Sequence, residues 1–177
     1  MGPAQATSTC LRKAFTPSGR ASRSEFWWFA CVCAGVVLLA AILEEFLIEW
    51  LLARERAEGL AYGREWRTSA NWLSSVHPLI WASLAAVAFP LHAAGSRRLH
   101  DIGAPRVLVL LPAGVLAVGY LRTLLDGPRN SELAGLGWAI TIFALFCLVS
   151  AGLAVLLMLR AQPGANRYGR NPHEVSR

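Results

Sequence analysis

Three short polar stretches contain the residues of this sequence that are best suited to chemistry. Residues 19–25 read Gly-Arg-Ala-Ser-Arg-Ser-Glu, residues 97–103 read Arg-Arg-Leu-His-Asp-Ile-Gly, and residues 163–172 read Pro-Gly-Ala-Asn-Arg-Tyr-Gly-Arg-Asn-Pro. Arginine side chains bind phosphate and carboxylate groups, and His100 next to Asp101 offers the residue types of a proton-transferring pair. These three stretches are therefore the candidate functional residues.

Each stretch also has a purely structural interpretation. Ser22 and Glu25 have the spacing of a capping box at the start of a helix. Gly103 suits the left-handed residue that follows the end of a helix. Neighbouring residues on a helix do not face each other, so His100 and Asp101 are not expected to act as a catalytic pair. The Pro-Gly and Asn-Pro pairs of the third stretch mark turns, which predicts an ordered turn there.

Long apolar runs separate the polar stretches. The chain has 177 residues, of which 55% are hydrophobic and 16% are charged, whereas an average soluble domain has about 25% charged residues. About 20 apolar residues in a helix cross the bilayer core of about 30 Å. We therefore expect an all-α integral membrane four-helix bundle rather than a soluble enzyme. The four spans are predicted at about residues 26–48, 70–96, 104–121 and 133–159.

The expected organisation is a single membrane domain. Residues 15–172 form the four-span domain, residues 173–177 form a tail, and residues 1–14 form an N-terminal cytoplasmic segment whose order the sequence leaves open. The acidic and apolar residues after the first span, 44–52, either prolong its helix or lie in the interface as an amphipathic helix. A cleaved signal peptide is not expected, because the first apolar run begins only at Phe26.

Lysine and arginine are distributed unevenly over the predicted loops. The N-terminal segment, the loop between the second and third spans and the C-terminal tail together hold 11 Lys or Arg and three acids. The other two loops hold six Lys or Arg and eight acids. Because cytoplasmic loops are enriched in Lys and Arg, both termini and the middle loop are expected in the cytoplasm. Topology thus explains the net charge of +6, and no nucleic-acid partner is expected.

The predicted topology brings the three polar stretches to one side of the membrane, each within a few residues of a span. The candidate residues of this cytoplasmic polar cluster, for a ligand or for structure, are Arg20, Ser22, Arg23, Glu25, Arg97, Arg98, His100, Asp101, Gly103, Asn166, Arg167, Tyr168, Gly169 and Asn171. Arginines outnumber acids among them, and this surplus suits anionic phosphate from a lipid head group or a solute. A testable hypothesis for this cluster is an ion pair between Glu25 and Arg98.

The three stretches, in this order and topology, resemble one known family. Residues 19–28, 97–103 and 163–172 are similar to motifs of the domain of unknown function 805 family, the YhaH-like bacterial inner-membrane proteins, and the resemblance extends over about residues 15–172. It implies a small multi-pass protein of the bacterial inner membrane. No established biochemical activity accompanies this resemblance.

Function is predicted less sharply than topology. No recognised catalytic motif and no zinc-spaced Cys/His cluster is present, so we expect no enzyme activity, no catalytic residue, no metal and no cofactor. The preferred hypothesis is a non-catalytic binding or scaffold protein whose Arg-rich cytoplasmic face contacts anionic lipid or a partner, such as a second copy or another membrane protein. The alternatives are an oligomeric small-solute transporter or channel and a membrane enzyme acting on lipid phosphates.

Overall fold

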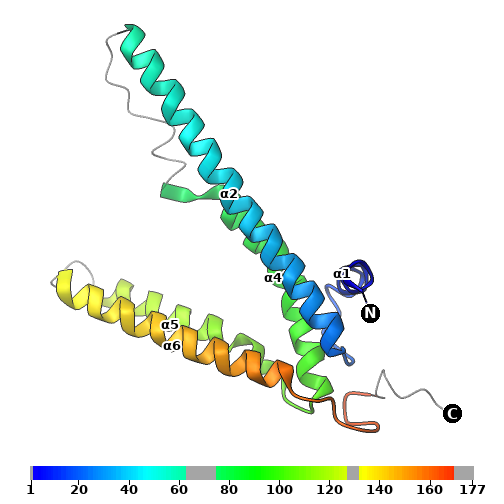
Figure 1. The fold of residues 1–177 in the computed structure, drawn as a ribbon. Helices are drawn as coiled ribbons and strands as arrows, with labels where there is room; N and C mark the ends of the chain where they lie inside the picture. The colour runs from blue at the N-terminus through cyan, green and yellow to red at the C-terminus, as the bar shows by residue number, and fades with distance from the viewer. Residues whose placement is uncertain (1, 63–74, 127–131, 170–177) are drawn as a thin grey trace.

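The computed structural model describes residues 2–62, 75–126 and 132–169. Within these residues the regular secondary structure is helical, apart from one isolated β-bridge. This confirms the predicted all-α class. In chain order the helices are α1 (Pro3–Arg12), α2 (Arg23–Tyr62), α4 (Pro78–Asp101), the 3-10 helix η1 (Arg106–Leu110), α5 (Leu111–Asp126) and α6 (Glu132–Met158) (Figure 1).

Three helices are long and apolar enough to cross a membrane. Their spanning stretches, Arg23–Glu58, Pro78–Asp101 and Leu136–Met158, reach mean hydropathies of 2.5, 1.4 and 2.7. Only 6% of the most apolar part of α6 is buried inside the protein. A soluble monomer does not leave so much apolar surface in contact with water. The helices therefore indicate a membrane protein.

The third predicted span, residues 104–121, is divided into two elements. The 3-10 helix η1 comes first, with Pro105 as its N-cap, and α5 follows with 16 residues. Pro112 lies in the first turn of α5, where its missing N–H is tolerated. The segment is therefore not one continuous α-helix, because it changes from a 3-10 helix to an α-helix at Leu111. That this segment crosses the membrane stays a prediction.

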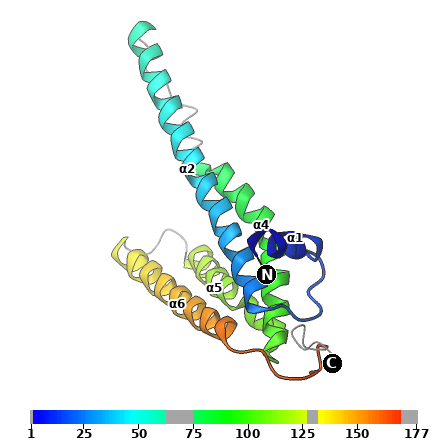
Figure 2. The same ribbon diagram turned by 45° about the vertical axis from the view of Figure 1, so that its right-hand side comes forward.

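The helices form two antiparallel hairpins. In one hairpin α2 packs along α4, and in the other α5 packs along α6. Figures 1 and 2 show that the hairpins meet at the end of the molecule where α1 lies and diverge toward the opposite end. The predicted four-helix bundle is not confirmed by this arrangement.

α2 is much longer than the span predicted for residues 26–48. It has 40 residues and no internal proline, and at 1.5 Å per residue it is about 60 Å long. The acidic and apolar segment after Leu43 prolongs the first helix, which is one of the two alternatives left open by the sequence. α2 therefore extends well past the thickness of a bilayer core.

α4 begins at Pro78 rather than near residue 70, and residues 70–74 lie outside the described part of the chain. His77 directly before it has a φ of 48°, in the left-handed region. Pro78 can occupy the first position of a helix but offers no N–H for an earlier turn. At its other end α4 continues to Asp101, so that the second polar stretch is its last turn.

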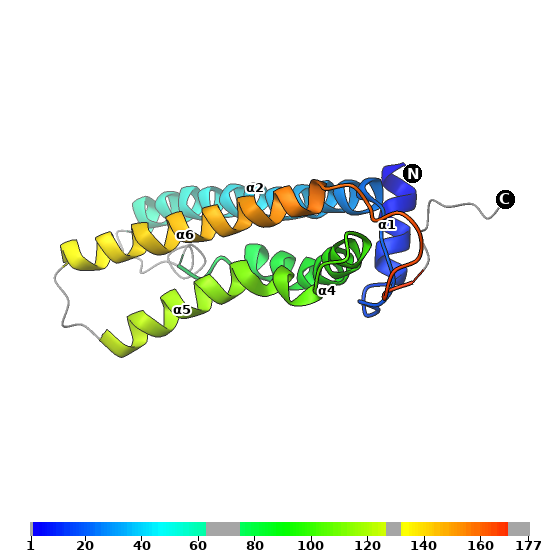
Figure 3. The ribbon, with the colours of Figure 1, turned by 90° about the horizontal axis from the view of Figure 1, so that it is seen from below.

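α1 lies across the end at which the two hairpins meet. It occupies most of residues 1–14, whose order the sequence left open, and buries Ala6 and Cys10. Figure 3 shows α1 crosswise to α2. The buried core lies at the same end and consists of Cys10, Phe26, Phe29, Cys33, Ala94, Leu99 and Leu157. This packed end also carries the three polar stretches.

Candidate functional site

The first polar stretch caps α2. The backbone N–H of Glu25 donates a hydrogen bond of 3.1 Å to Ser22 Oγ, which is half of the predicted capping box. Within the described part of the chain, the Glu25 carboxylate faces Arg97 instead of the Ser22 amide, with an N–O distance of 3.6 Å. The reciprocal half of the box is therefore not formed, because the neighbouring guanidinium holds the carboxylate.

Asp101 is the carboxylate at the centre of the cluster. Its Oδ1 accepts a hydrogen bond of 2.8 Å from Arg20 Nε, and its Oδ2 accepts one from Arg98 Nη1. All three side chains are at most 1% exposed. Buried charges require such partners, since an unpaired one loses its hydration without compensation. Asp101 thus joins the loop before α2 to the last turn of α4.

Arg98 also closes the end of α6. Its Nε donates to the carbonyl of Leu157 over 3.0 Å, and its Nη2 donates to the carbonyl of Leu159. The last carbonyls of a helix have no partner within it, and a cation there also interacts favourably with the helix dipole. The buried guanidinium of Arg98 therefore links Asp101, in the last turn of α4, to the backbone carbonyls at the end of α6.

Arg97 binds backbone carbonyls of the segment that follows α1. Its Nη1 donates to the carbonyls of Lys13 and Thr16, at 2.8 and 3.0 Å. Its Nη2 lies 3.6 Å from the Glu25 carboxylate. The expected ion pair between Glu25 and Arg98 is therefore wrong: adjacent residues point to different sides of a helix, and Arg97 is the one that faces Glu25.

Cys10 completes the environment of Glu25. Its Sγ lies 3.7 Å from Glu25 Oε1 and 3.6 Å from Arg97 Nη2. Burial, aided by the charge of Glu25, raises the pKa of the Cys10 thiol to about 11. A thiol with so little thiolate is a poor nucleophile. Cys10 therefore packs α1 onto α2 and α4 rather than acting as a reactive group.

Arg20 fastens the third polar stretch to the end of α4. Its guanidinium donates to the carbonyls of Gln162, Gly164 and Asp101, at 2.7, 2.8 and 3.3 Å. From the other direction Asn166 Nδ2 donates to the carbonyl of His100 over 2.9 Å. The segment after α6 is therefore an ordered turn, as predicted, and it is docked on the end of α4.

Gly103 ends α4 in the predicted left-handed conformation, with a φ of +79°. The N–H of Gly103 bonds the carbonyl of His100, and the N–H of Ala104 bonds that of Leu99, at 3.1 and 2.9 Å. This pair of bonds is the Schellman motif. A Cβ on Gly103 would lie 2.3 Å from the side chain of Gln162, so glycine is required for space as well as for conformation.

His100 does not face Asp101. Its Nδ1 lies 3.2 Å from the carbonyl oxygen of Gly19, and its ring stacks on Tyr168 with centroids 3.8 Å apart. The guanidinium carbon of Arg167 lies over the ring of Tyr168, 4.6 Å from its centroid. His100 therefore positions the turn after α6, and the geometry offers no catalytic pair with Asp101.

The remaining candidate residues lie at the edge of the cluster. Gly169 is left-handed, with a φ of +126°, and forms the isolated bridge with Asn166. Asn171 lies outside the described residues. Arg23 and Arg167 are exposed, unlike Arg20, Arg97 and Arg98. The structure thus divides the arginines into three buried ones, which bind protein groups, and a set at the rim.

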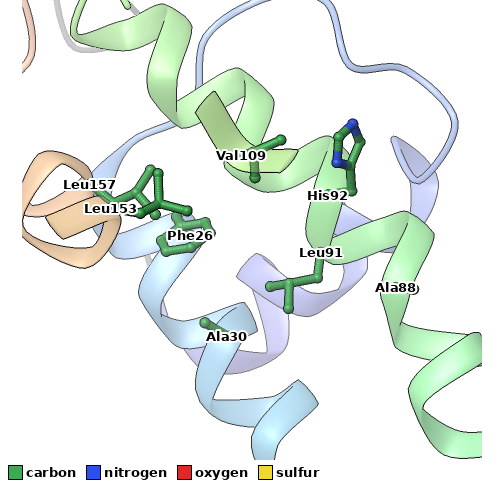
Figure 4. Close-up of a pocket in the computed structure, with 8 residues that line it drawn as sticks. All are labelled: Phe26, Ala30, Ala88, Leu91, His92, Val109, Leu153 and Leu157. Carbon is green, nitrogen blue, oxygen red and sulfur yellow. The ribbon is translucent and has the colours of Figure 1, made fainter. Parts of the chain in front are cut away.

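Two hollows lie near the start of α2 and the end of α6, and one of them is lined by the buried Arg98. The polar hollow, of about 250 Å³, is lined by Arg23, Ser24, Arg98, Asp101 and Ala161. The apolar cavity, of about 310 Å³, is lined by Phe26, Ala30, Ala88, Leu91, His92, Val109, Leu153 and Leu157. Figure 4 shows the ring of Phe26 next to Leu153 and Leu157, with Val109 and His92 across from them.

Sequence reasoning did not find every group at this end. Gln162, Cys10 and the carbonyls of Lys13 and Thr16 were outside the candidate set, although they contact Arg20 or Arg97. Backbone carbonyls give no sequence signal. Among the described residues, no group of three or more His, Cys, Asp or Glu could hold a metal ion.

A third buried carboxylate, besides those of Glu25 and Asp101, was also missed and lies far along α2. Glu44 is fully buried and accepts hydrogen bonds from the backbone N–H groups of Leu79 and Ile80, at 3.0 and 3.2 Å. His77, the N-cap residue of α4, makes no side-chain cap. Glu44 therefore supplies from another helix the acceptor that an N-cap side chain normally provides.

The fold and the site define a helical membrane protein whose packed end is fastened by buried arginines. The chain belongs to the family described as "Protein of unknown function (DUF805)", which matches residues 14–170. This confirms the family resemblance of the three polar stretches. No curated protein and no solved structure matches the chain.

Proposed function

We propose that this protein is a non-catalytic, multi-pass protein of the bacterial inner membrane whose Arg-rich cytoplasmic face binds the phosphate of anionic lipids. The observation that carries the proposal is Arg23. Its guanidinium is exposed, lines the polar hollow, and has no hydrogen bond or ion pair among the described residues. A guanidinium beside a hydroxyl such as that of Ser24 is a suitable partner for a phosphate oxygen.

The proposed orientation of the protein in the membrane rests on the distribution of charged residues. Both termini and the loop between α4 and η1 belong to the segments that hold 11 Lys or Arg against three acids. The cytoplasmic leaflet carries the negative surface potential that attracts basic residues close to the membrane. With α5 as a fourth span, the rim of exposed cations lies at the level of the lipid phosphates. It comprises Arg12, Lys13, Arg23, Arg106, Arg160 and Arg167.

The apolar cavity supports a lipid rather than a small soluble anion. Arg23, Phe26 and Ala30 lie at spacings of three and four and so share one face of α2. On the opposite side, Leu153 and Leu157 lie four residues apart on α6, and Ala161 follows the end of that helix. Arg23 and Ala161 border the polar hollow. The other four residues, Phe26, Ala30, Leu153 and Leu157, border the apolar cavity. A phosphate in the hollow would place an acyl chain toward the cavity.

The buried arginines support a structural role for the centre of the cluster. Arg20, Arg97 and Arg98 bind carboxylates and backbone carbonyls of this chain. Their hydrogen-bonding capacity is largely used within the protein. A ligand therefore meets the rim and not the centre, which favours binding or scaffolding over lipid-phosphate chemistry and over solute transport.

Native mass spectrometry of the detergent-solubilised protein tests the proposal. We expect phosphatidylglycerol to be retained at least five-fold more than phosphatidylcholine at equal concentration. Arg23→Gln should remove most of this preference, whereas the matched control Arg56→Gln, at an exposed position on the outer part of α2 and outside the rim, should retain it. Equal retention of both lipids by the wild type would contradict the proposal.

A second pair of variants tests the acyl-chain site. Ala30→Phe fills the apolar cavity and should reduce retention of phosphatidylglycerol. Ala34→Phe places the same side chain on an exposed position of α2 and should not. Equal effects of the two substitutions would contradict a role for the cavity.

A further inference from the structure

The outer part of α2 projects beyond the membrane. A helix of 40 residues is about twice as long as the 30 Å core of a bilayer is thick. Because α2 begins at Arg23, about 20 residues suffice to reach the other interface, and charged residues reappear there at Glu44 and Glu45. The remainder of the helix therefore lies outside the bilayer, where an exposed apolar face needs a partner.

An apolar stripe runs along this outer part. Leu43, Phe46, Trp50, Ala53 and Ala57 follow each other at alternating spacings of three and four residues. All five are exposed, and Phe46 is exposed to 73%. This spacing is that of the a and d positions of a coiled coil.

The stripe extends into the membrane in the same register. Val36 and Leu39 continue it and are also exposed. The pattern thus covers three heptads, which is the length at which heptad spacing indicates a coiled coil.

The opposite face of α2 is already occupied within the chain. Glu44 is fully buried and caps α4, and Ile48 is 5% exposed. In the heptad defined by Leu43 as position a, these residues occupy positions b and f, away from the stripe. The contact with α4 and the apolar stripe therefore do not compete for the same surface.

Charges flank the stripe in a self-complementary way. Glu49 occupies position g, and Arg54 occupies the following position e, five residues further along. In a parallel two-stranded coiled coil, residues at g and at the following e of the partner helix form ion pairs. Glu49 has no partner among the described residues. Arg54 bonds the exposed Glu58 over 2.8 Å, a surface contact that is readily exchanged.

We infer that two copies of this chain associate through a parallel coiled coil formed by residues 43–57 of α2. Two copies inserted in one membrane with the same orientation present α2 in parallel, as the register requires. A two-fold interface uses the same patch on both subunits, so each Glu49 meets the partner's Arg54. The small Ala53 and Ala57 allow close approach of the two helices.

Cysteine cross-linking in native membranes tests the register of this interface. The full chain is used with Cys10, Cys31, Cys33 and Cys147 replaced by serine or alanine. With copper phenanthroline as oxidant, Ala53→Cys and Ala57→Cys should yield mostly dimers of twice the chain mass. Glu45→Cys and Glu58→Cys, on the outer sides of the helix, should yield several-fold less. Equal yields at all four positions, or a product of another mass, would overturn the inference.

A charge exchange tests the proposed ion pair independently. In the Ala53→Cys background, Glu49→Arg and Arg54→Glu should each lower the dimer yield several-fold, because like charges then meet. The double variant restores opposite charges and should return the yield to that of the parent. A double variant that remains as poor as the single ones, or single variants without effect, would overturn the parallel register.

Discussion

At the scale of single residues, the packed end depends on a few buried charges with several bonds each. Asp101 accepts hydrogen bonds from the buried guanidinium groups of Arg20 and Arg98. Arg20 also binds the carbonyl of Gln162 in the segment after α6, and Arg98 binds the carbonyl of Leu157 at the end of α6. In this design a single carboxylate neutralises groups that hold α4, α6 and the loop before α2. Removing one partner of a buried pair costs much more than the pair itself contributes.

Asp101→Asn should therefore be strongly destabilising. The substitution leaves Arg20 and Arg98 with one carboxylate fewer in a buried site, and we expect a loss of about 3–5 kcal/mol in the free energy of unfolding. Chemical denaturation in mixed micelles measures it. Arg23→Gln, at an exposed position, is the control and should change stability by about 0.5 kcal/mol or less. A loss below about 1 kcal/mol for Asp101→Asn would contradict the structural role of the cluster.

Gly103→Ala tests the end of α4. Alanine in the left-handed region costs about 1–2 kcal/mol, and its Cβ would also displace Gln162 from the turn that Arg20 holds. We expect a lower melting temperature. Gly35→Ala, inside α2 with nothing within 4 Å of the new Cβ, should leave the melting temperature unchanged or raise it, since alanine favours a helix interior. Equal stability of both variants would speak against this role of Gly103.

Several features of the site at this scale are predictable from sequence, and their partners are not. The Ser22 cap and the left-handed Gly103 depend on local geometry, and both were predicted. The partner of Glu25 depends on which side of α4 faces α2, and the prediction chose Arg98 instead of Arg97. Adjacent side chains diverge by about 100° on a helix, so only tertiary packing distinguishes them.

At the scale of elements, Glu44 connects the far part of α2 to the start of α4. Glu44→Ala should leave the amides of Leu79 and Ile80 without an acceptor and reduce stability by about 0.5–2 kcal/mol, the usual range for a lost cap. Hydrogen exchange should become faster at the first turn of α4, and this effect should be local. Glu45→Ala, the exposed neighbour, is the matched control. Unchanged exchange at Leu79 and Ile80 would show that Glu44 is not the cap.

The sequence predicts helix positions better than helix ends. Apolar runs located α2, α4 and α6, because hydrophobic length is read directly from composition. The end of α2 was left open, since residues 44–52 fit both a longer helix and an interfacial one. α1 was not predicted, because its short, largely polar sequence acquires its buried side only by packing on α2 and α4.

At the scale of the whole molecule, the arrangement combines a fastened end with two diverging hairpins (Figures 1 and 2). Their relative orientation could not be predicted, because residues that face lipid and residues that face protein are both apolar in a membrane. The arginine-rich stretches, in contrast, converge at one end as the topology predicted. The buried arginines hold the helices and the turn after α6 together, and we propose that the exposed rim binds lipid phosphates.

The most direct test of this account is thermal unfolding in lipid nanodiscs. A ligand that binds only the folded state raises its melting temperature, by about 2–4 °C per kcal/mol for a chain of this size. We expect a higher melting temperature with phosphatidylglycerol than with phosphatidylcholine alone, a gain that high salt reduces by screening.

Arg23→Gln should abolish most of this gain, whereas Arg56→Gln, exposed on the outer part of α2, should preserve it. This result would support binding of anionic lipid at the rim beside a structural centre. Equal melting temperatures in both lipids, or the same loss in both variants, would contradict the account.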